Sequence, residues 1–339
     1  MTVREQLQQT IDDLVDERRG ILAADESAPT IKKRFDAIGV ESTEENRRAY
    51  RSLLLDSDGL GEYLCGVILF EETLGQKNSS GVALPEVAWR QRIVPGIKVD
   101  KGKGPLPGAP GDLITAGLDG LAERLQTYMA QGARFAKWRE VYPITPANPT
   151  ALGLRANAEM LARYAAVCQE LGVVPIVEPE VLMDGDHDID RCAEVTERVL
   201  HSVFHALHLH GVVFEHMLLK PNMVLPAKDC RRAEPGEVAE ATLRVMRRSV
   251  PAAVPSINFL SGGQGPEEAT QNLNAINQSR GTAPWQLSIS YGRALQQPAL
   301  KAWGGKEENR AAAQAALLKR ARLNSLARQG QYRDAMEAE

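Results

Sequence analysis

The chain has only four cysteines among 339 residues, at Cys65, Cys168, Cys192 and Cys230. None of them forms a Cys-x-x-Cys pair, which excludes the usual spacing of a disulfide framework or a zinc ribbon. The amino-terminal segment MTVREQLQQT also lacks the basic and then apolar pattern of a signal peptide. We therefore expect a protein of the reducing cytoplasm.

Long apolar runs and an excess of basic residues are missing as well. No run approaches the roughly 18 residues that a membrane helix needs, so we expect a soluble protein that does not bind a membrane. The formal net charge is -4, with 40 Lys and Arg against 44 Asp and Glu. Such a balance does not favour binding to nucleic acid, and any anion must be bound locally.

Repeats and domain linkers are not found either. The Gly- and Pro-rich segment KGKGPLPGAPG, residues 101–111, is too short for a linker and is predicted to be a surface loop. We expect one catalytic domain over residues 1–330 and a short, polar and mobile tail over residues 331–339.

What the chain does contain is a series of short apolar runs, each followed by a stretch long enough for a helix. Continuous apolar runs of this kind are typical of parallel strands buried on both faces. Eight of them predict an α/β fold, a (β/α)₈ TIM barrel, with extra helices at residues 3–14 and 309–327. The runs are GILAAD (20–25), GVILFEE (66–72), VPGIKVD (94–100), FAKWREV (135–141), VVPIVEPE (173–180), HMLLKPN (216–222), INFLSGG (257–263) and QLSISYGR (286–293).

Polar and charged residues follow nearly every run. The carboxyl ends of barrel strands gather at one mouth, where active sites of this fold are built. Any one charge could simply mark the end of a strand, but so many charges brought together are costly unless they pair or bind a ligand. We therefore expect an active site made from the residues at these strand ends.

Lys220 is the most informative of these residues, because it directly follows Met217, Leu218 and Leu219. A lysine at a strand end commonly extends its charge into water. In a low-dielectric site beside other cations it loses its proton more readily and becomes a nucleophile, and a carboxylate such as Glu178 can then move protons for it. The pattern predicts a site that attacks a carbonyl group.

Phosphate binding is indicated by LSGGQG and SYGR, which follow the last two runs. Their glycines let backbone N–H groups approach an anion closely, and this is the usual phosphate site of such barrels. A Gly-Gly pair alone is more often an ordinary turn.

The six histidines all lie between residues 187 and 216. His201, His205 and His208 share one helix face and could in principle bind zinc. They fall within a crossover helix rather than at the barrel mouth, so we interpret them as surface or packing residues and predict no metal site.

The chain resembles the class I fructose-bisphosphate aldolases over residues 20–331. The resemblance rests on long motifs in the same order, among them GILAADES, GVILFEETL, GIKVDKG, FAKWR, PIVEPE, LLKPNMV, FLSGGQ, SYGRALQ and LKAWGGK. It implies a barrel that is usually a homotetramer in the cytoplasm, acts in glycolysis and gluconeogenesis, needs no metal or other cofactor, and binds a small phosphorylated sugar.

The resemblance also implies roles for single residues. Lys220 would form a Schiff base with the substrate ketone, with Glu178 as acid and base and Lys137 as its electrostatic partner. Asp25 would take the proton of the C4 hydroxyl, and Glu180 and Ser290 would hold neighbours in place. One phosphate would lie on Ser261, Gly262, Gly292 and Arg293, and the other on Lys33, Arg34, Lys98 and Arg139.

The reaction implied is reversible cleavage of fructose 1,6-bisphosphate to dihydroxyacetone phosphate and glyceraldehyde 3-phosphate. A protonated imine on Lys220 would accept the electrons of the C3–C4 bond. This chain departs from the family at Pro29, where a glycine-containing turn is common. Tyr332 follows the last helix too closely to correspond to the terminal tyrosine of animal members, so we expect no catalytic role for residues 331–339.

Three other functions fit part of the pattern. A metal-dependent aldolase or isomerase would be abolished by a chelator. A transaldolase-like transferase would share the imine on Lys220 but would not need a phosphate site at both ends of its substrate. A non-catalytic scaffold would keep the fold, but it would have no need of the acid and base residues that this chain retains.

Overall fold

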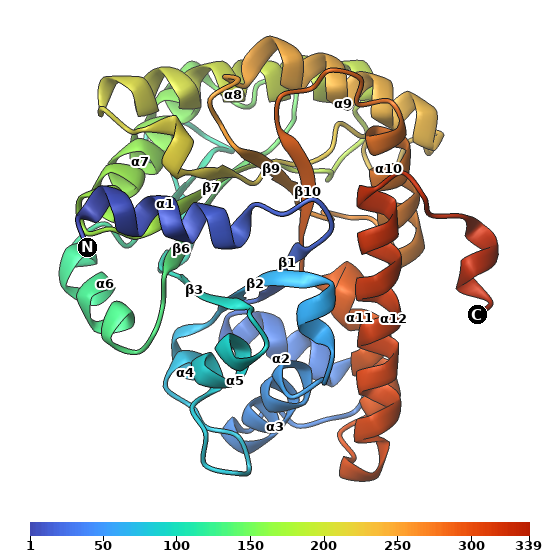
Figure 1. Ribbon diagram of the computed structural model, residues 1–339. Helices are drawn as coiled ribbons and strands as arrows, with labels where there is room; N and C mark the ends of the chain where they lie inside the picture. The colour runs from blue at the N-terminus through green and yellow to red at the C-terminus, as the bar shows by residue number, and fades with distance from the viewer.

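The computed structural model describes residues 1–339 and contains a closed barrel of eight parallel strands (Figure 1). The strand order around the barrel is β1-β10-β9-β8-β7-β6-β3-β2, and β1 closes it by pairing with both β10 and β2. Each of the eight predicted runs supplies one strand, which confirms the predicted fold. The strands are β1 (Gly20–Ala24), β2 (Leu64–Leu69), β3 (Val94–Lys98), β6 (Phe135–Tyr142), β7 (Val174–Val181), β8 (Leu218–Leu219), β9 (Ser256–Phe259) and β10 (Gln286–Tyr291).

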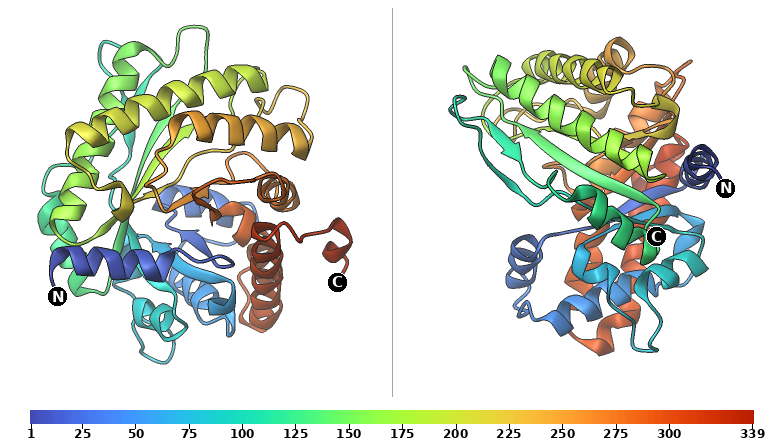
Figure 2. Two further views of the ribbon diagram at one scale, coloured as in Figure 1. Left: turned by 45° about the horizontal axis from the view of Figure 1, so that its top comes forward. Right: turned by 90° about the vertical axis from the view of Figure 1, so that its left-hand side faces the viewer.

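Helices surround the barrel and cover its outer surface (Figures 1 and 2). They follow the strands in sequence, as the right-handed crossovers of parallel strands require. Their bounds are α2 (Ala28–Asp36), α3 (Glu44–Leu55), α4 (Glu71–Leu74), α5 (Leu84–Arg90), α6 (Leu121–Ala130), α7 (Ala151–Glu170), α8 (Ile189–Leu209), α9 (Pro235–Ser249), α10 (Pro266–Gln278), α11 (Arg293–Trp303) and α12 (Arg310–Arg328).

The extra helix α1 (Val3–Leu14) closes the amino-terminal end of the barrel. It begins at a capping box in which Thr2 and Glu5 satisfy each other's backbone N–H groups. Its buried face, Leu7, Ile11 and Leu14, packs in one cluster with residues from the starts of several strands, including Val94 and Phe135. With this end covered, the opposite, carboxyl-terminal end is the open one.

The main hydrophobic core contains 80 buried residues and lies largely between the barrel and its helices. Inside the barrel the packing is close enough to specify single residues. A Cβ atom on Gly96 would lie 2.3 Å from ring atoms of Phe135, so glycine is required where β3 passes that ring.

Two sequence predictions need correction at the carboxyl end of the barrel. Residues 101–111 are not a plain loop, because β4 (Lys103–Pro105) pairs with β5 (Leu113–Thr115) in an antiparallel hairpin. In the right-hand view of Figure 2 this teal hairpin lies on the side of the barrel away from α1. Glu71 and Glu72 belong to the short helix α4 rather than to a strand end.

The tail, which the sequence analysis expected to be mobile, contacts the rest of the fold in this structure. Tyr332 is only 4% exposed, and its hydroxyl donates to Oε1 of Glu337 at 3.0 Å. The carboxylate of Glu337, in a short 3₁₀ helix (Asp334–Glu337), accepts from Nη1 of the buried Arg320 on α12 at 2.5 Å. Arg320 also donates to the Pro266 carbonyl at the start of α10 at 3.0 Å. The tail is therefore docked on α10 and α12.

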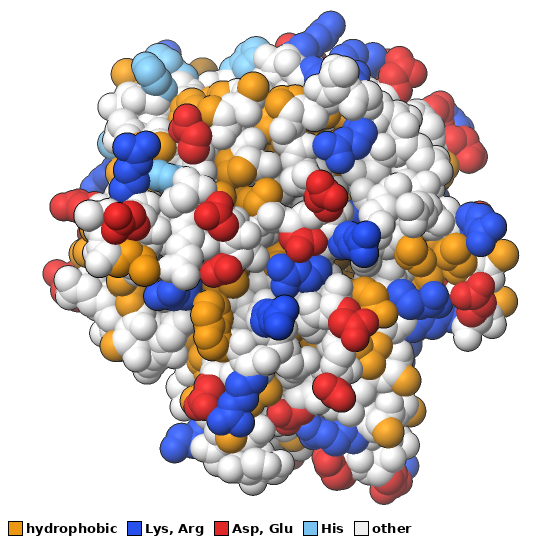
Figure 3. All heavy atoms as spheres, viewed as in Figure 1, with side chains coloured by type: hydrophobic (Ala, Val, Ile, Leu, Met, Phe, Trp, Pro, Cys, Tyr) orange, Lys and Arg blue, Asp and Glu red, His pale blue; other side chains and the backbone are white.

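None of the helices is both long and apolar enough to cross a membrane. On the face that α1 crosses, basic and acidic side chains are interspersed, and neither sign covers an extended area (Figure 3).

Candidate active site

A cavity of about 710 Å³ opens at the carboxyl end of the barrel; we call it the mouth cavity. Thirteen of the fourteen predicted site residues line it. They are Asp25, Arg34, Lys98, Lys137, Arg139, Glu178, Glu180, Lys220, Ser261, Gly262, Ser290, Gly292 and Arg293. The fourteenth, Lys33, does not: it is exposed on α2 and is absent from the cavity wall.

The two-residue period of a strand explains why these side chains meet. Lys137 and Arg139 on β6, and Glu178 and Glu180 on β7, are each two residues apart and so share the inner face of the barrel. Lys220 lies one residue beyond β8, where its backbone N–H still donates to the Val177 carbonyl at 2.8 Å. The last backbone hydrogen bond of a two-residue strand thus places the amine at the mouth.

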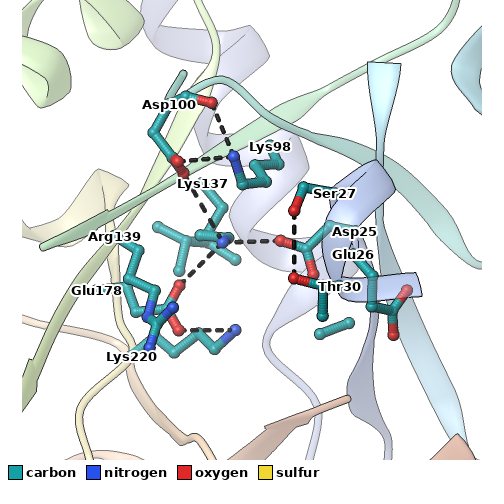
Figure 4. A network of polar contacts seen from close by, with 12 residues as sticks. Asp25, Glu26, Ser27, Thr30, Lys98, Asp100, Lys137, Arg139, Glu178 and Lys220 are labelled. Carbon is teal, nitrogen blue, oxygen red and sulfur yellow. Dashed lines mark hydrogen bonds and ion pairs between the residues drawn. The ribbon is translucent and has the colours of Figure 1, made fainter. Parts of the chain in front are cut away.

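Glu178 lies between two lysines at the bottom of the mouth cavity (Figure 4). Its Oε1 is 3.2 Å from Nζ of Lys220, and its Oε2 is 3.1 Å from Nζ of Lys137. All three side chains are nearly inaccessible, at 4% exposed for each lysine and 5% for Glu178. One carboxylate is therefore within proton-transfer distance of the Lys220 amine.

Asp25 approaches the same group from the end of β1. Its Oδ2 lies 2.7 Å from Nζ of Lys137, and Asp100 lies 4.0 Å from that nitrogen (Figure 4). Burial would raise the pKa of Asp25, but the charges of Lys137, Lys220 and Lys98 outweigh burial and hold it well below its usual range. Burial would likewise lower the pKa of Lys137, yet Asp25, Glu178 and Asp100 hold it above its usual range. Asp25 and Lys137 are thus a charged pair.

Arg139 is held by Glu180, whose carboxylate accepts from its Nε. This contact is consistent with the expectation that Glu180 holds a neighbour in place. A Cβ atom on Gly262 would come within 3.2 Å of Oε1 of Glu180 and 2.8 Å of Leu260, so a glycine is needed for the 261–263 turn to approach the cavity.

The predicted phosphate residues after β9 and β10 lie together on the mouth cavity. Arg293 begins α11 and donates from Nη2 to the Gln264 carbonyl at 3.1 Å, while Ser261 and Gly262 belong to the neighbouring turn. Ser290 is buried, but its hydroxyl has no hydrogen-bond partner in the protein. No contact therefore supports the expectation that Ser290 holds a neighbour in place.

Arg34 reaches the cavity from α2 and donates to Glu26, a residue that the sequence analysis missed. Glu26 also lies 2.6 Å from Nη2 of the buried Arg51 and accepts from Gln296 at 2.7 Å. Two signals in the sequence could have found it, its position directly after Asp25 and its place in the motif GILAADES. The hydroxyls of Ser27 and Thr30, 3.2 Å apart, line the cavity on the same side and were missed as well (Figure 4).

The three histidines of α8 do not form a metal site. His201, His205 and His208 lie on the exposed face of the helix, away from the mouth cavity. No group of three or more His, Cys, Asp or Glu side chains has the arrangement of metal ligands.

A second hollow of similar size, about 750 Å³, lies near α1 and the start of β3. Its wall includes Asp13, Arg19 and Trp89 but no lysine, so it offers no amine for attack on a carbonyl. The chemistry concentrates in the mouth cavity, where a buried amine, a carboxylate in contact with it and several cations converge. Such a set can form an imine with a ketone and hold anionic groups beside it.

Comparison with known proteins identifies the family of this chain. The family described as "Glycolytic: Fructose-bisphosphate aldolase class-I" matches residues 6–339. A cytosolic fructose-bisphosphate aldolase of Arabidopsis thaliana is 56% identical over 93% of this chain and 80% of its own length. A chloroplastic one of Chlamydomonas reinhardtii is 56% identical over 97% and 86%.

The similarity extends to animals and to a solved structure. Fructose-bisphosphate aldolase B of Gallus gallus is 54% identical over 93% of this chain and 87% of its own length. The solved aldolase of Plasmodium falciparum, in complex with TRAP and a small-molecule inhibitor, is 52% identical with a TM-score of 0.96, and the match covers 98% of this chain and 96% of that one.

Proposed function

The chain belongs to the class I fructose-bisphosphate aldolase family, a family of lyases, and from that premise we propose that Lys220 forms the Schiff base of the reaction. The substrate is fructose 1,6-bisphosphate, cleaved reversibly to dihydroxyacetone phosphate and glyceraldehyde 3-phosphate in glycolysis and gluconeogenesis. The observation that carries the proposal is the buried position of Glu178 between the amines of Lys220 and Lys137.

Imine formation is the first step. Nζ of Lys220 attacks the C2 carbonyl carbon, and the resulting carbinolamine must lose its oxygen as water. Glu178, 3.2 Å from that nitrogen, takes the proton from the amine and donates one to the departing hydroxyl. The positive charge of Lys137, 3.1 Å from Glu178, compensates the carboxylate while the proton is absent.

Cleavage of the C3–C4 bond follows. Asp25 accepts the proton of the C4 hydroxyl, the C4–O bond becomes the carbonyl of glyceraldehyde 3-phosphate, and the bonding electrons pass through C3 to the protonated imine. The enamine that remains is protonated at C3, and water then releases dihydroxyacetone phosphate from Lys220. The ion pair of Asp25 with Lys137 keeps the accepting carboxylate ionised and oriented.

The two phosphates are assigned to two parts of the mouth cavity, which meet where Nη2 of Arg34 lies 3.8 Å from the position of a Cβ atom on Gly292. Ser261, Gly262, Gly292 and Arg293 hold one, and Arg34, Lys98 and Arg139 contribute to the other, with Ser27 and Thr30 beside them. Lys33 has no place in this arrangement, because its side chain is outside the cavity wall.

Three further properties rest on the family resemblance. We propose a homotetramer, which light scattering tests, and a reaction without metal or other cofactor, which assays in EDTA test. We also propose a cytoplasmic location, which is supported by the cytosolic relatives and tested by cell fractionation, since a chloroplastic relative is equally similar.

The function is tested by measuring cleavage of fructose 1,6-bisphosphate in a coupled assay. Lys220→Met should lower kcat by more than about a thousandfold, the scale seen when a covalent nucleophile is removed. Lys301→Met, which changes an exposed lysine on α11, is the matched control and should keep full activity. Activity of Lys220→Met within tenfold of the unaltered enzyme, or loss of activity in EDTA, would refute the proposal.

A further inference from the structure

Cations outnumber carboxylates on the wall of the mouth cavity. Eight cationic side chains line it, Arg34, Lys98, Lys101, Lys103, Lys137, Arg139, Lys220 and Arg293, against six acidic ones, Asp25, Glu26, Glu71, Asp100, Glu178 and Glu180. The wall therefore has a surplus of positive charge. The position of this surplus charge depends on which cations are paired with carboxylates.

Six of the eight cations contact a carboxylate. The pairs are Arg34 with Glu26, Lys98 with Asp100, Lys101 with Glu71, Lys137 with Asp25 and Glu178, Arg139 with Glu180, and Lys220 with Glu178. Only Arg293 and Lys103 have no carboxylate oxygen within ion-pair distance, so the surplus charge lies on these two. Arg293 is already assigned to one phosphate, and Lys103 has no role so far.

Lys103 and Arg293 come from opposite sides of the barrel. Arg293 follows β10, whereas Lys103 lies on the hairpin that connects β3 to β6. In the order β1-β10-β9-β8-β7-β6-β3-β2, β6 is four places from β10 in a closed ring of eight strands, which is the diametrically opposite position. The two unpaired cations therefore enter the wall of the cavity from opposite sides of the barrel.

The position of Lys103 is fixed by the hairpin. Its partner in register is Thr115, which also lines the cavity. The Thr115 hydroxyl donates to the Arg139 carbonyl at 2.8 Å, and its N–H donates to Oε2 of the buried Glu140 at 3.1 Å. Burial, and next the charge of Arg139, lower the pKa of Lys103.

A sugar with a phosphate at each end brings two dianions into this cavity. Where a cation is already paired, binding a phosphate means sharing or breaking that ion pair, whereas an unpaired cation gains a full partner. Two unpaired cations on opposite sides match two phosphates on one substrate.

We propose that Lys103 contacts the phosphate distal to Arg293, and so makes the site prefer a ketose bisphosphate over a ketose monophosphate. The inference deepens the proposed function and depends on it. It also adds an unpaired cation of the β4–β5 hairpin to the residues already assigned to the distal phosphate.

The test compares Lys103→Met with Lys103→Arg on two substrates, fructose 1,6-bisphosphate and fructose 1-phosphate, which lacks the distal phosphate. Lys103→Met should raise KM for the bisphosphate about tenfold, the scale of one charge-assisted contact at an exposed position, and leave KM for the monophosphate within twofold. Lys103→Arg should restore most of the loss. Lys306→Met, which removes an exposed lysine outside the cavity wall, is the control for net charge and should change neither value.

Equal changes in KM for both substrates, no change in either, or an equal effect of Lys306→Met would overturn the role of Lys103. Borohydride trapping of dihydroxyacetone phosphate separates this failure from failure of the proposed function. Trapping should be complete in Lys103→Met, because the triose has no distal phosphate. If trapping is absent from every variant and also from the unaltered enzyme, the imine itself is refuted.

Discussion

Oδ2 of Asp25 lies 2.7 Å from Nζ of Lys137, in a site where both side chains are shielded from water. The lysine lowers the pKa of Asp25 against the opposing effect of burial, so this carboxylate stays ionised far into acid. A permanently ionised carboxylate at the mouth cavity is ready to accept a proton from the substrate but has little tendency to keep it. Asp25 is thus suited to C–C cleavage, and the first steps of imine formation belong to Glu178.

Changing Asp25→Asn should separate the two stages of the reaction. The amide cannot accept the C4 hydroxyl proton, so we expect cleavage of fructose 1,6-bisphosphate to fall by at least about a hundredfold, the lower range for loss of a general base. Imine formation with dihydroxyacetone phosphate, measured by borohydride trapping, should change by less than about threefold, because Asp25 is not the acid or base of that step. The control Asp12→Asn changes an exposed residue of α1 and should match the unaltered enzyme. An equal loss of cleavage and of trapping in Asp25→Asn would contradict the division of roles between Asp25 and Glu178.

Arg293→Ala should weaken binding rather than chemistry. Its guanidinium is free of carboxylates and can contact a phosphate with two N–H groups. We expect KM for fructose 1,6-bisphosphate and for fructose 1-phosphate to rise roughly tenfold to a hundredfold, with trapping at saturating substrate retained. Arg90→Ala, which breaks an exposed pair with Glu86, provides the comparison. Michaelis constants unchanged by Arg293→Ala would count against its role.

Deleting residues 331–339 should affect stability more than catalysis. None of these residues lines the mouth cavity, so turnover should change by less than about tenfold, which corresponds to roughly 1.4 kcal/mol of barrier. The deletion removes Glu337 and leaves Arg320 buried without its carboxylate, so the free energy of unfolding should fall by on the order of 3 kcal/mol.

Removing only Ala338 and Glu339 is the matched control, because the pair with Arg320 remains, and denaturant unfolding measures both variants. A truncated enzyme that is folded and trappable at Lys220 but has lost most proton exchange at the enamine carbon would show that the tail is catalytic.

Glu140 should make stability depend on pH near neutrality. Burial raises its pKa to about 7 from 4.5, although its carboxyl accepts from Trp138 and Thr115. Between these two values the folded protein keeps a proton that the unfolded chain has released, so stability falls as pH rises from about 4.5 to about 7 and is constant above.

The measurement is denaturant unfolding of the unaltered protein and of Glu140→Gln at pH values from about 5 to 8. Relative to the variant, the unaltered protein should lose about 3 kcal/mol over this range, since each pKa unit corresponds to about 1.4 kcal/mol. The test compares how steeply the free energy of unfolding changes with pH in the two proteins. Absolute stabilities are not compared, because the glutamine also disturbs the two hydrogen bonds. Parallel curves for the two proteins would show that Glu140 is ionised in the fold at all of these pH values.

The sequence predicted the parts of the site that depend on local patterns. Each buried run ends in the residues that line the cavity, because a parallel strand shows its end directly as a change from apolar to polar residues. The sequence pattern could not show which of Lys33 and Arg34 lines the cavity. Adjacent residues on a helix point about 100° apart, and only the packing of α2 decides that Arg34 faces the cavity while Lys33 faces solvent.

The missed features depend on contacts between distant residues. The β4–β5 hairpin has two strands of three residues each in a segment rich in Gly and Pro, too short to show alternation, and its pairing is visible only in the fold. The tail is polar in composition, yet Tyr332 is buried because Glu337 folds back to Arg320. Several of the ion pairs on the cavity wall, those of Lys137, Arg139 and Lys220, likewise join the ends of different strands.

The central claim, an imine on Lys220, is tested most directly by borohydride reduction in the presence of dihydroxyacetone phosphate or fructose 1,6-bisphosphate, with the labelled peptide identified by mass spectrometry. We predict irreversible inactivation, a reduced triose or hexose adduct on the peptide that contains Lys220, and no effect of EDTA. An adduct on Lys137 or on any other lysine, inactivation without an adduct, or protection by EDTA would contradict the account.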